Sequence, residues 1–354
     1  MIKKRTIKQT INSWRRNMLL TALSRSLVIG LATAAIFSAL PHSAMAKKKM
    51  KMASATINDV QHQWQKTFKK GVDARSGGKL EFGIFPASQL GTIPRMLEGT
   101  LLGTIESFIT PMAFAVGTDS RLRVFDAPGL FENPDHLRRT IHDPAYRNHV
   151  ETMLLNKGVR VLGIIYNSPF VVLTKKPAPK LSDLKGKKIR TFASPLQIEP
   201  LKALGANALP LPLSEVVPAL QSGSIDGMLA GIPILTAFKF YDTAKYVTEL
   251  HFSHIVSANL VNEKWFQGLS SDLKTILREE GRKAEKAVFD FGIANLGRAS
   301  AGWTKNGGKI LKLNDADRKK MMALFLDIGG KLLSANAGIK AEYDRLVKVA
   351  NSVR

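Results

Sequence analysis

The residues best suited to chemistry form one short stretch, Lys188-Ile189-Arg190-Thr191-Phe192 followed by Ser194-Pro195. The first five are typical of a strand, and Ser194-Pro195 is typical of a cap residue followed by the first position of a helix. In an open α/β sheet, ligands bind beyond the carboxyl ends of strands and face helix N-termini. A planar guanidinium beside free N–H groups is a good carboxylate receptor, so Arg190 is the candidate anchor. The alternative is a surface arginine that bonds a backbone carbonyl.

Motifs for catalysis are missing from the sequence. It has no Gly-x-Ser-x-Gly, no His-Glu-x-x-His, no phosphate loop and no dinucleotide-binding glycine pattern. The one close histidine pair, His251 and His254, follows a stretch that reads as extended, so we expect it to be structural. We therefore predict no catalytic residue, no metal and no cofactor.

Strand and helix patterns alternate along most of the chain and predict an α/β fold with parallel pairing. The expected strands are 50–55, 79–85, 159–166, 171–174, 188–192 and 208–211. Between Ser270 and Trp303, apolar residues repeat at helical spacing without an internal proline. A helix of that length is too large for one small lobe and is expected to bridge two.

Composition limits the class of protein further. The chain has 354 residues, enough for two domains, with 45% hydrophobic and 23% charged residues and no cysteine. Disulfides, thiol nucleophiles and Cys-ligated metals are thereby excluded. The formal net charge is +24, but the basic residues are scattered and no RNA- or DNA-binding motif accompanies them. We interpret the charge as a solvated surface and predict no nucleic-acid partner.

The first 46 residues are typical of an export signal. A basic region runs to Arg25, an apolar stretch of about 14 residues follows, and Ala44-Met45-Ala46 is a small-residue cleavage site. The apolar stretch is shorter than the roughly 20 residues of a spanning helix. We predict a signal peptide over 1–46, cleaved after Ala46, and a periplasmic protein without an anchor of its own. An uncleaved N-terminal anchor is the alternative.

Several motifs in order resemble the solute-binding proteins of tripartite ATP-independent periplasmic (TRAP) transporters, the DctP family. They are Phe85-Pro86-Ala87-Ser88-Gln89-Leu90-Gly91, Asp126-Ala127-Pro128-Gly129-Leu130-Phe131, Leu184-Lys185-Gly186-Lys187-Lys188-Ile189-Arg190 and Ser224-Ile225-Asp226-Gly227. The similarity spans essentially all of 50–350.

The resemblance implies a two-lobed periplasmic binding protein of the Venus-flytrap type, with a long lobe-spanning helix. Lobe I would comprise 47–168 plus 256–295. Lobe II would comprise 169–255 plus 296–354, with the C-terminal helices. It also implies a receptor that binds a small organic acid and delivers it to a TRAP-type permease driven by an ion gradient. In the family, the arginine at the position of Arg190 pairs with the ligand carboxylate.

Departures from the family pattern bear on the ligand. Sugar-acid binders of the family carry a ligand-binding asparagine where this chain has Ala230, and a second arginine where it has Phe170. Their polar ligand contacts fall on Pro111 and Phe114 here. Their loss favours a smaller or less polar acid over a sugar acid. The complete set of predicted substrate-binding residues is Arg190, Phe170, Phe192, Ser194, Asn167, Pro111, Phe114, Leu213 and Ala230.

Two other functions share this fold. An exported enzyme would need a nucleophile and base that the sequence does not display as a motif. A sensory protein that presents its ligand to a membrane receptor would bind in the same way. We predict a transport receptor and not an enzyme.

Overall fold

The computed structural model describes residues 47–354, and the signal peptide predicted over 1–46 lies outside them. Within residues 47–354, no helix is both long enough and apolar enough to cross a membrane.

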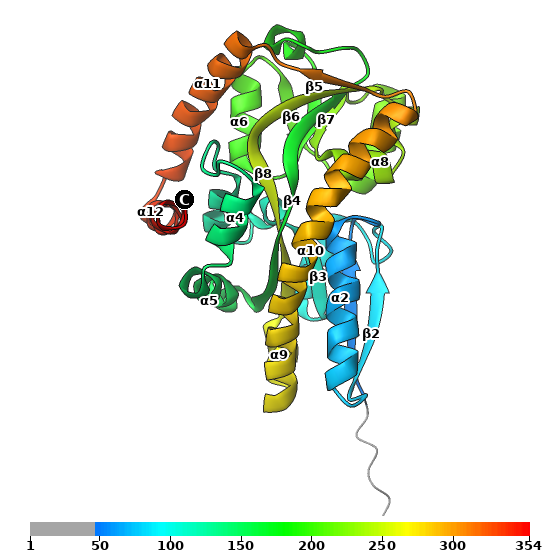
Figure 1. The fold of residues 1–354 in the computed structure, drawn as a ribbon, viewed down its shortest axis with the longest axis vertical. Coiled ribbons are helices and arrows are strands. Elements are labelled where there is room, and N and C mark those ends of the chain that lie inside the picture. The colour runs from blue at the N-terminus through cyan, green and yellow to red at the C-terminus, as the bar shows by residue number, and fades with distance from the viewer. Residues whose placement is uncertain (1–46) are drawn as a thin grey trace, which may run out of the picture. The chain divides into compact units, whose positions relative to one another are not determined.

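A single mixed sheet runs through the described part of the chain (Figure 1). Its strand order is β2-β1-β3-β8-β4-β7-β5-β6, with β9 also paired to β8. The strands are β1 (Lys48–Ser54), β2 (Leu80–Phe85), β3 (Ser107–Pro111), β4 (Val159–Thr174), β5 (Lys188–Thr191), β6 (Asn207–Pro210), β7 (Gly227–Ala230), β8 (Tyr246–Asn262) and β9 (Lys309–Lys312).

The expected α/β class is confirmed, but purely parallel pairing is wrong. β1 to β3 are parallel to one another, as are β5 to β7. The long strands β4 and β8 lie between these two sets and pair antiparallel with each other and with β3 and β7. Periodicity reports which face of a strand is buried and not the direction of its neighbour, so the sequence pattern could not reveal this. β4 also joins two stretches that we expected to be separate strands.

Each parallel set is attached to a different end of the long strands. β3 pairs with 257–261 of β8, whereas β7 pairs with 171–174 of β4. Between these ends, the β4–β8 register shifts at Val161/Gly163, Tyr166/Ser168 and Pro169/Val171. Such irregularities bend and twist a strand pair. The sheet therefore consists of two parallel portions joined by a bent antiparallel ribbon.

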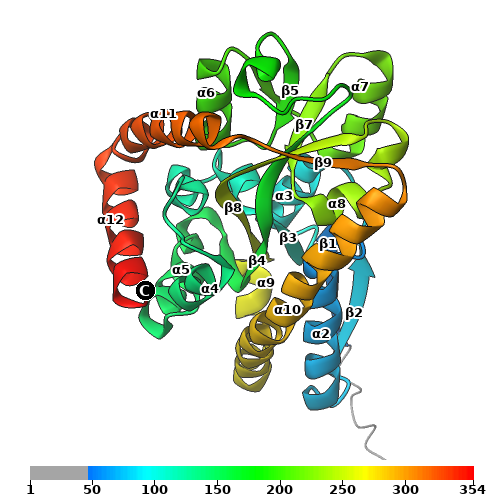
Figure 2. The same ribbon diagram turned by 45° about the horizontal axis from the view of Figure 1, so that its top comes forward.

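Helices cover both portions of the sheet (Figure 2). They are α2 (Val60–Arg75), α3 (Ile93–Leu102), α4 (Pro134–Ile141), α5 (Pro144–Thr152), α6 (Pro195–Ala203), α7 (Val216–Ser222), α8 (Ile232–Ala237), α9 (Glu263–Gln267), α10 (Ser271–Lys305), α11 (Asp315–Leu333) and α12 (Ala337–Ser352). Short 3-10 helices are η1 (Met112–Ala115), η2 (Ser120–Asp126), η3 (Leu155–Lys157), η4 (Leu181–Leu184), η5 (Leu213–Glu215) and η6 (Phe240–Asp242).

The predicted long helix is confirmed as α10. It packs against α2 and β4 along one part of its length and against α8 and β9 along another (Figure 1). Gly281 lets it approach the sheet, because a Cβ there would lie 2.4 Å from the carbonyl oxygen of Leu162. One helix thus braces both portions of the sheet.

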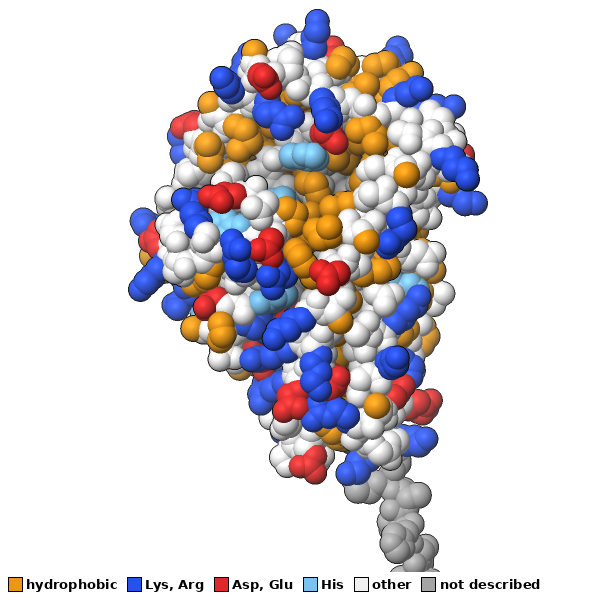
Figure 3. All heavy atoms as spheres, viewed as in Figure 1, with side chains coloured by type: hydrophobic (Ala, Val, Ile, Leu, Met, Phe, Trp, Pro, Cys, Tyr) orange, Lys and Arg blue, Asp and Glu red, His pale blue; other side chains and the backbone are white. Residues whose placement is uncertain are grey.

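The charged surface follows the scattered pattern expected from the sequence. Figure 3 shows lysine and arginine side chains spread over the visible face with acidic side chains among them. An apolar depression lies near the middle of the same face.

Candidate functional site

A cavity lies where the two portions of the sheet meet. Its volume is about 40 Å³, room for only a few water molecules. Its wall comes from the loop after β1, the ends of β3, β5 and β7, the irregular middle of β4, and α10. The lining residues are Ala55, Thr56, Asp59, Val60, Gln61, Ile93, Pro111, Phe114, Asn167, Ser168, Arg190, Phe192, Leu213, Met228, Ala230, Gly231, Pro233, Ile234, Ile255, Gly292 and Asn295.

Arg190 is buried in this wall. It is the third residue of β5, and only 1% of its surface is exposed to solvent. Its Nε donates to the carbonyl oxygen of Leu211 at 2.8 Å, and its Nη1 donates to the carbonyl oxygen of Leu229 at 3.3 Å. A guanidinium has five N–H donors, so these bonds fix its orientation and leave others for a ligand.

Two aromatic rings hold the guanidinium in place. Its central carbon lies 4.9 Å from the ring centroid of Phe192 and 5.5 Å from that of Phe114. The two rings stack on each other with centroids 4.8 Å apart. Aromatic faces attract a cation and shield it from water. Arg190 is therefore held as a preoriented, poorly hydrated cation.

Arg190 differs from two other buried arginines in having no acidic neighbour. Arg147 lies 2.8 Å from Glu285, and Arg160 lies 2.7 Å from Glu263 and 3.1 Å from Glu151. Among residues 47–354, no carboxylate lies within 4.0 Å of Arg190. Burial lowers the pKa of Arg190 to about 9. A buried cation without a counter-ion favours binding of an anion.

Helix α6 supports the aromatic wall from behind. Ser194 is its N-cap and Pro195 its first residue, as the sequence predicts. Gln197, in the first turn, accepts a hydrogen bond on Oε1 from the backbone N–H of Phe192 at 3.1 Å. The helix N-terminus thus holds the residue that lies against Arg190.

Seven of the nine predicted binding residues line the cavity, and two do not. The seven are Asn167, Arg190, Phe192, Pro111, Phe114, Leu213 and Ala230. Phe170 is fully buried, stacked on Phe252 at 5.1 Å and edge-on to Phe192 at 5.7 Å. Ser194 is likewise fully buried. These two lie outside the lining, and a ligand-binding role for any of the nine stays a prediction.

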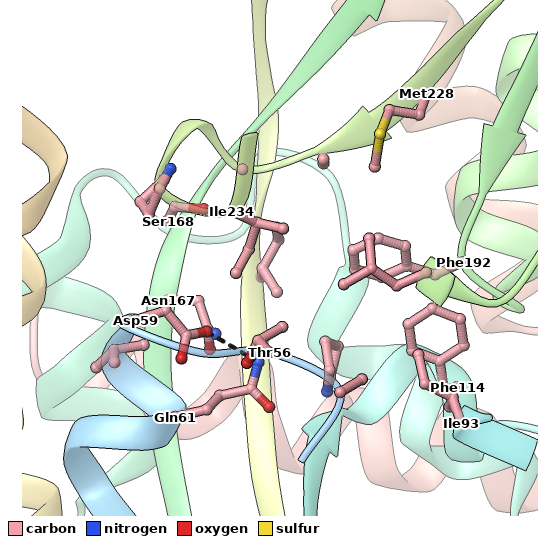
Figure 4. A pocket seen from close by; sticks show the side chains of 18 of the residues that line it. Thr56, Asp59, Gln61, Ile93, Phe114, Asn167, Ser168, Phe192, Met228 and Ile234 are labelled. Carbon is pink, nitrogen blue, oxygen red and sulfur yellow. Dashed lines mark hydrogen bonds between the residues drawn. The ribbon is translucent and has the colours of Figure 1, made fainter. Parts of the chain in front are cut away.

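On the other side of the cavity, Asp59 and Gln61 were not predicted from the sequence; they lie beside Asn167, which was predicted. Figure 4 shows Asp59, Gln61 and Asn167 together, facing the side that carries Phe114 and Phe192. Asp59 caps α2 by accepting the N–H of His62 at 3.0 Å, and Gln61 Nε2 donates to it at 3.4 Å. Burial raises the pKa of Asp59, against the opposing effect of its hydrogen bonds. A signal was available, because Asp59 and Gln61 follow the carboxyl end of β1.

The histidine pair contributes nothing to the cavity wall. His254 lies against Tyr166, with ring centroids 5.6 Å apart, and burial lowers its pKa to about 4. Over residues 47–354, no group of three or more His, Asp or Glu side chains is arranged to hold a metal ion.

This chain is similar to known periplasmic solute-binding proteins in both sequence and fold. The family model for "bacterial extracellular solute-binding protein, family 7" (DctP) matches residues 52–329. The 2,3-diketo-L-gulonate-binding periplasmic protein of Escherichia coli is 29% identical over 70% of this chain and 76% of its own length.

Two solved structures share the fold. A TRAP periplasmic solute-binding protein from Desulfovibrio salexigens with bound orotic acid has a TM-score of 0.80 and 24% identity, covering 87% of this chain and 98% of that one. A TRAP periplasmic solute-binding protein from Shewanella oneidensis with bound succinate has a TM-score of 0.77 and 22% identity. The match covers 87% of this chain and 99% of that one. None of these three proteins is named as an enzyme.

Proposed function

We propose that this chain, which belongs to the bacterial extracellular solute-binding proteins of family 7, binds a small organic acid and delivers it to a membrane permease of the TRAP type. The three similar proteins named above are described with diketogulonate, orotic acid and succinate, all of them acids. Their common chemistry supports a carboxylate ligand here, and it leaves the identity of the acid open.

The observation that carries the proposal is the state of Arg190. This cation is 1% exposed, is fixed by Leu211 and Leu229, and has no carboxylate within 4.0 Å among residues 47–354. A ligand carboxylate placed in the cavity would accept the remaining N–H groups in a planar, two-bond arrangement. It would also neutralise the buried charge.

The second part of the proposal is that the acid is enclosed between two lobes, 47–168 plus 256–295 and 169–255 plus 296–354. The lining supports this division. Asp59, Phe114 and Asn167 belong to the first set of residues, and Arg190 and Phe192 to the second. The register shifts of β4 and β8 around Ser168 and Pro169 supply a bend between them. Because the cavity holds only about 40 Å³, entry of an organic acid requires the two sets to separate.

The apolar part of the lining supports a ligand with few hydroxyl groups. Leu213, Met228, Ala230 and Ile255 offer a hydroxyl no side-chain hydrogen-bond partner. Each buried hydroxyl left without a partner costs about 1–3 kcal/mol. The middle of the cavity therefore suits a short aliphatic or aromatic acid better than a sugar acid.

Mass spectrometry of small molecules released from the purified protein tests this function, followed by thermal unfolding with a panel of acids. A true ligand raises Tm with concentration, because binding stabilises the native state by RT ln(1 + [L]/Kd). Uptake of the labelled ligand by cells lacking this protein tests the delivery step. Release of no carboxylic acid, together with no change in Tm across the panel, would contradict the proposal.

Delivery outside the cytoplasm requires export, and we propose that residues 1–46 are removed after Ala46. N-terminal sequencing of the mature protein should then begin at Lys47. A membrane-embedded protein that retained its first 46 residues would contradict this step.

A further inference from the structure

The polar side of the cavity holds hydrogen-bond acceptors that lack partners. Gln61 Oε1 and Asn167 Oδ1 are buried and accept no hydrogen bond from any atom of residues 47–354. The two residues are only 2% and 7% exposed. Buried polar atoms are almost always paired in native proteins, so atoms without a partner in a ligand cavity indicate that the ligand supplies one.

The orientation of Gln61 shows which kind of group is missing. Its Nε2 donates to Asp59 Oδ2 at 3.4 Å, and a carboxylate can only accept. Oε1 is therefore the atom left over, and it too can only accept. Asp59 already accepts the N–H of His62 on its other oxygen, which fixes the carboxylate. Gln61 therefore presents a buried acceptor, and not a donor, to a ligand in this cavity.

The two sides of the cavity are chemically opposite. Arg190 lies over the rings of Phe114 and Phe192 and offers N–H donors. Figure 4 shows Asp59, Gln61 and Asn167 across the cavity from those rings. A plain apolar acid would satisfy Arg190 and leave the acceptors unpaired, and a second carboxylate would place negative charge next to Asp59.

We propose that the acid held by Arg190 carries a nitrogen-borne hydrogen donor, an amine or an amide, at its other end, and that Gln61 and Asn167 select for it. A nitrogen group is preferred to a hydroxyl because one nitrogen carries two or three N–H donors, whereas a hydroxyl carries one. One nitrogen can thus serve Gln61 and Asn167 together. This inference rests on the proposed function, since it takes Arg190 as the carboxylate anchor.

Two pairs of acids that differ only in the group at the far end test the proposal by calorimetry. 4-Aminobutanoate is compared with pentanoate, and succinamate with 4-oxopentanoate, so that nitrogen replaces a methyl carbon in each pair. In at least one pair, the nitrogen acid should bind about tenfold more tightly or better, the effect of hydrogen bonds that pair buried groups. Equal or weaker binding of both nitrogen acids would overturn the proposal.

Variants of Gln61 and Asn167 test selection for nitrogen separately from the proposed binding of an organic acid. Gln61→Met and Asn167→Leu keep side-chain size and remove an acceptor. Each should reduce the preference for the nitrogen acid over its methyl partner by about fivefold or more. Circular dichroism reports whether each variant is folded.

Gln63→Met is the matched control. Gln63 is on the same helix, donates to Thr67 and lies outside the cavity lining, so its loss should not alter the preference. If pentanoate and 4-oxopentanoate bind and the nitrogen acids show no advantage, the inference fails and the proposed function stands. If no carboxylic acid binds in this series or in the wider panel, both fail.

Discussion

The side-chain amide of Gln197 bridges Asp126 and the backbone of Phe192. Its Nε2 donates to Asp126 Oδ2 at 3.2 Å, and its Oε1 accepts the Phe192 N–H at 3.1 Å. Asp126 precedes α6 by about seventy residues, so this contact joins distant parts of the chain behind the aromatic wall. It connects a buried carboxyl to the residue that lies over Arg190.

The buried carboxyl of Asp126 predicts a pH dependence of stability. Burial raises its pKa from 3.8 to about 7, and hydrogen bonds from neighbouring side chains only partly oppose this. Between pH 4 and 7 this carboxyl is protonated more in the folded protein than in the unfolded chain, so its contribution to the free energy of unfolding falls as pH rises. Asp126→Asn removes the titration and retains the acceptor for Gln197.

Chemical denaturation at pH 4 to 8 measures the effect. The free energy of unfolding of Asp126→Asn, relative to wild type, should increase across this range by roughly 3–5 kcal/mol. Asp327→Asn, at a position that is 60% exposed, is the control. A difference between Asp126→Asn and wild type that stayed constant with pH would show that the carboxyl ionises normally.

Substitution of Arg190 should weaken ligand binding severely. Removing one partner of a buried ion pair costs roughly 3–5 kcal/mol, which is about 150- to 5,000-fold in affinity. Arg190→Lys keeps the charge and loses the planar fork, so it should recover only part of the loss. Calorimetry on Arg190→Ala, Arg190→Lys and wild type with the identified acid measures both effects.

Lys187→Ala is the control for the Arg190 variants, since Lys187 is nearby in the sequence and outside the cavity lining. Because Arg190 is buried and bonded to two carbonyl groups, its loss also alters packing. Circular dichroism must therefore show that each variant is folded. A folded Arg190→Ala that binds within about threefold of wild type, under 1 kcal/mol, would exclude Arg190 as the anchor.

Ligand binding should bring the two proposed lobes together. The chain has no cysteine, so Lys70→Cys on α2 and Lys202→Cys on α6 would give unique labelling sites, both exposed. Energy transfer between dyes at these positions should increase when ligand is added. Dyes at Lys70→Cys and Gln267→Cys, both within the proposed lobe I, provide the control. An unchanged distance between the lobes at saturating ligand would contradict closure.

Local patterns in the sequence were sufficient to predict much of this molecule. The strand that contains Arg190, the cap at Ser194, the helix over 271–305 and the α/β class all depend on residues near one another in the chain. The order of motifs added the family and the candidate anchor. The predicted local elements are confirmed because strand period, helix period and capping act over a few residues.

Contacts between distant segments depended on the tertiary structure. Asp59 and Gln61 precede Arg190 by about 130 residues, and only the packing of the two parallel strand sets around β4 and β8 places them on one cavity. The same packing puts Phe170 and Ser194 behind the wall, although both are near cavity residues in the sequence. The sequence by itself determined many of the elements and singled out Arg190 as the candidate cation for a carboxylate. The fold decided which side chains face that cation and whether an acid neutralises it, because burial and pairing arise only when distant segments pack together.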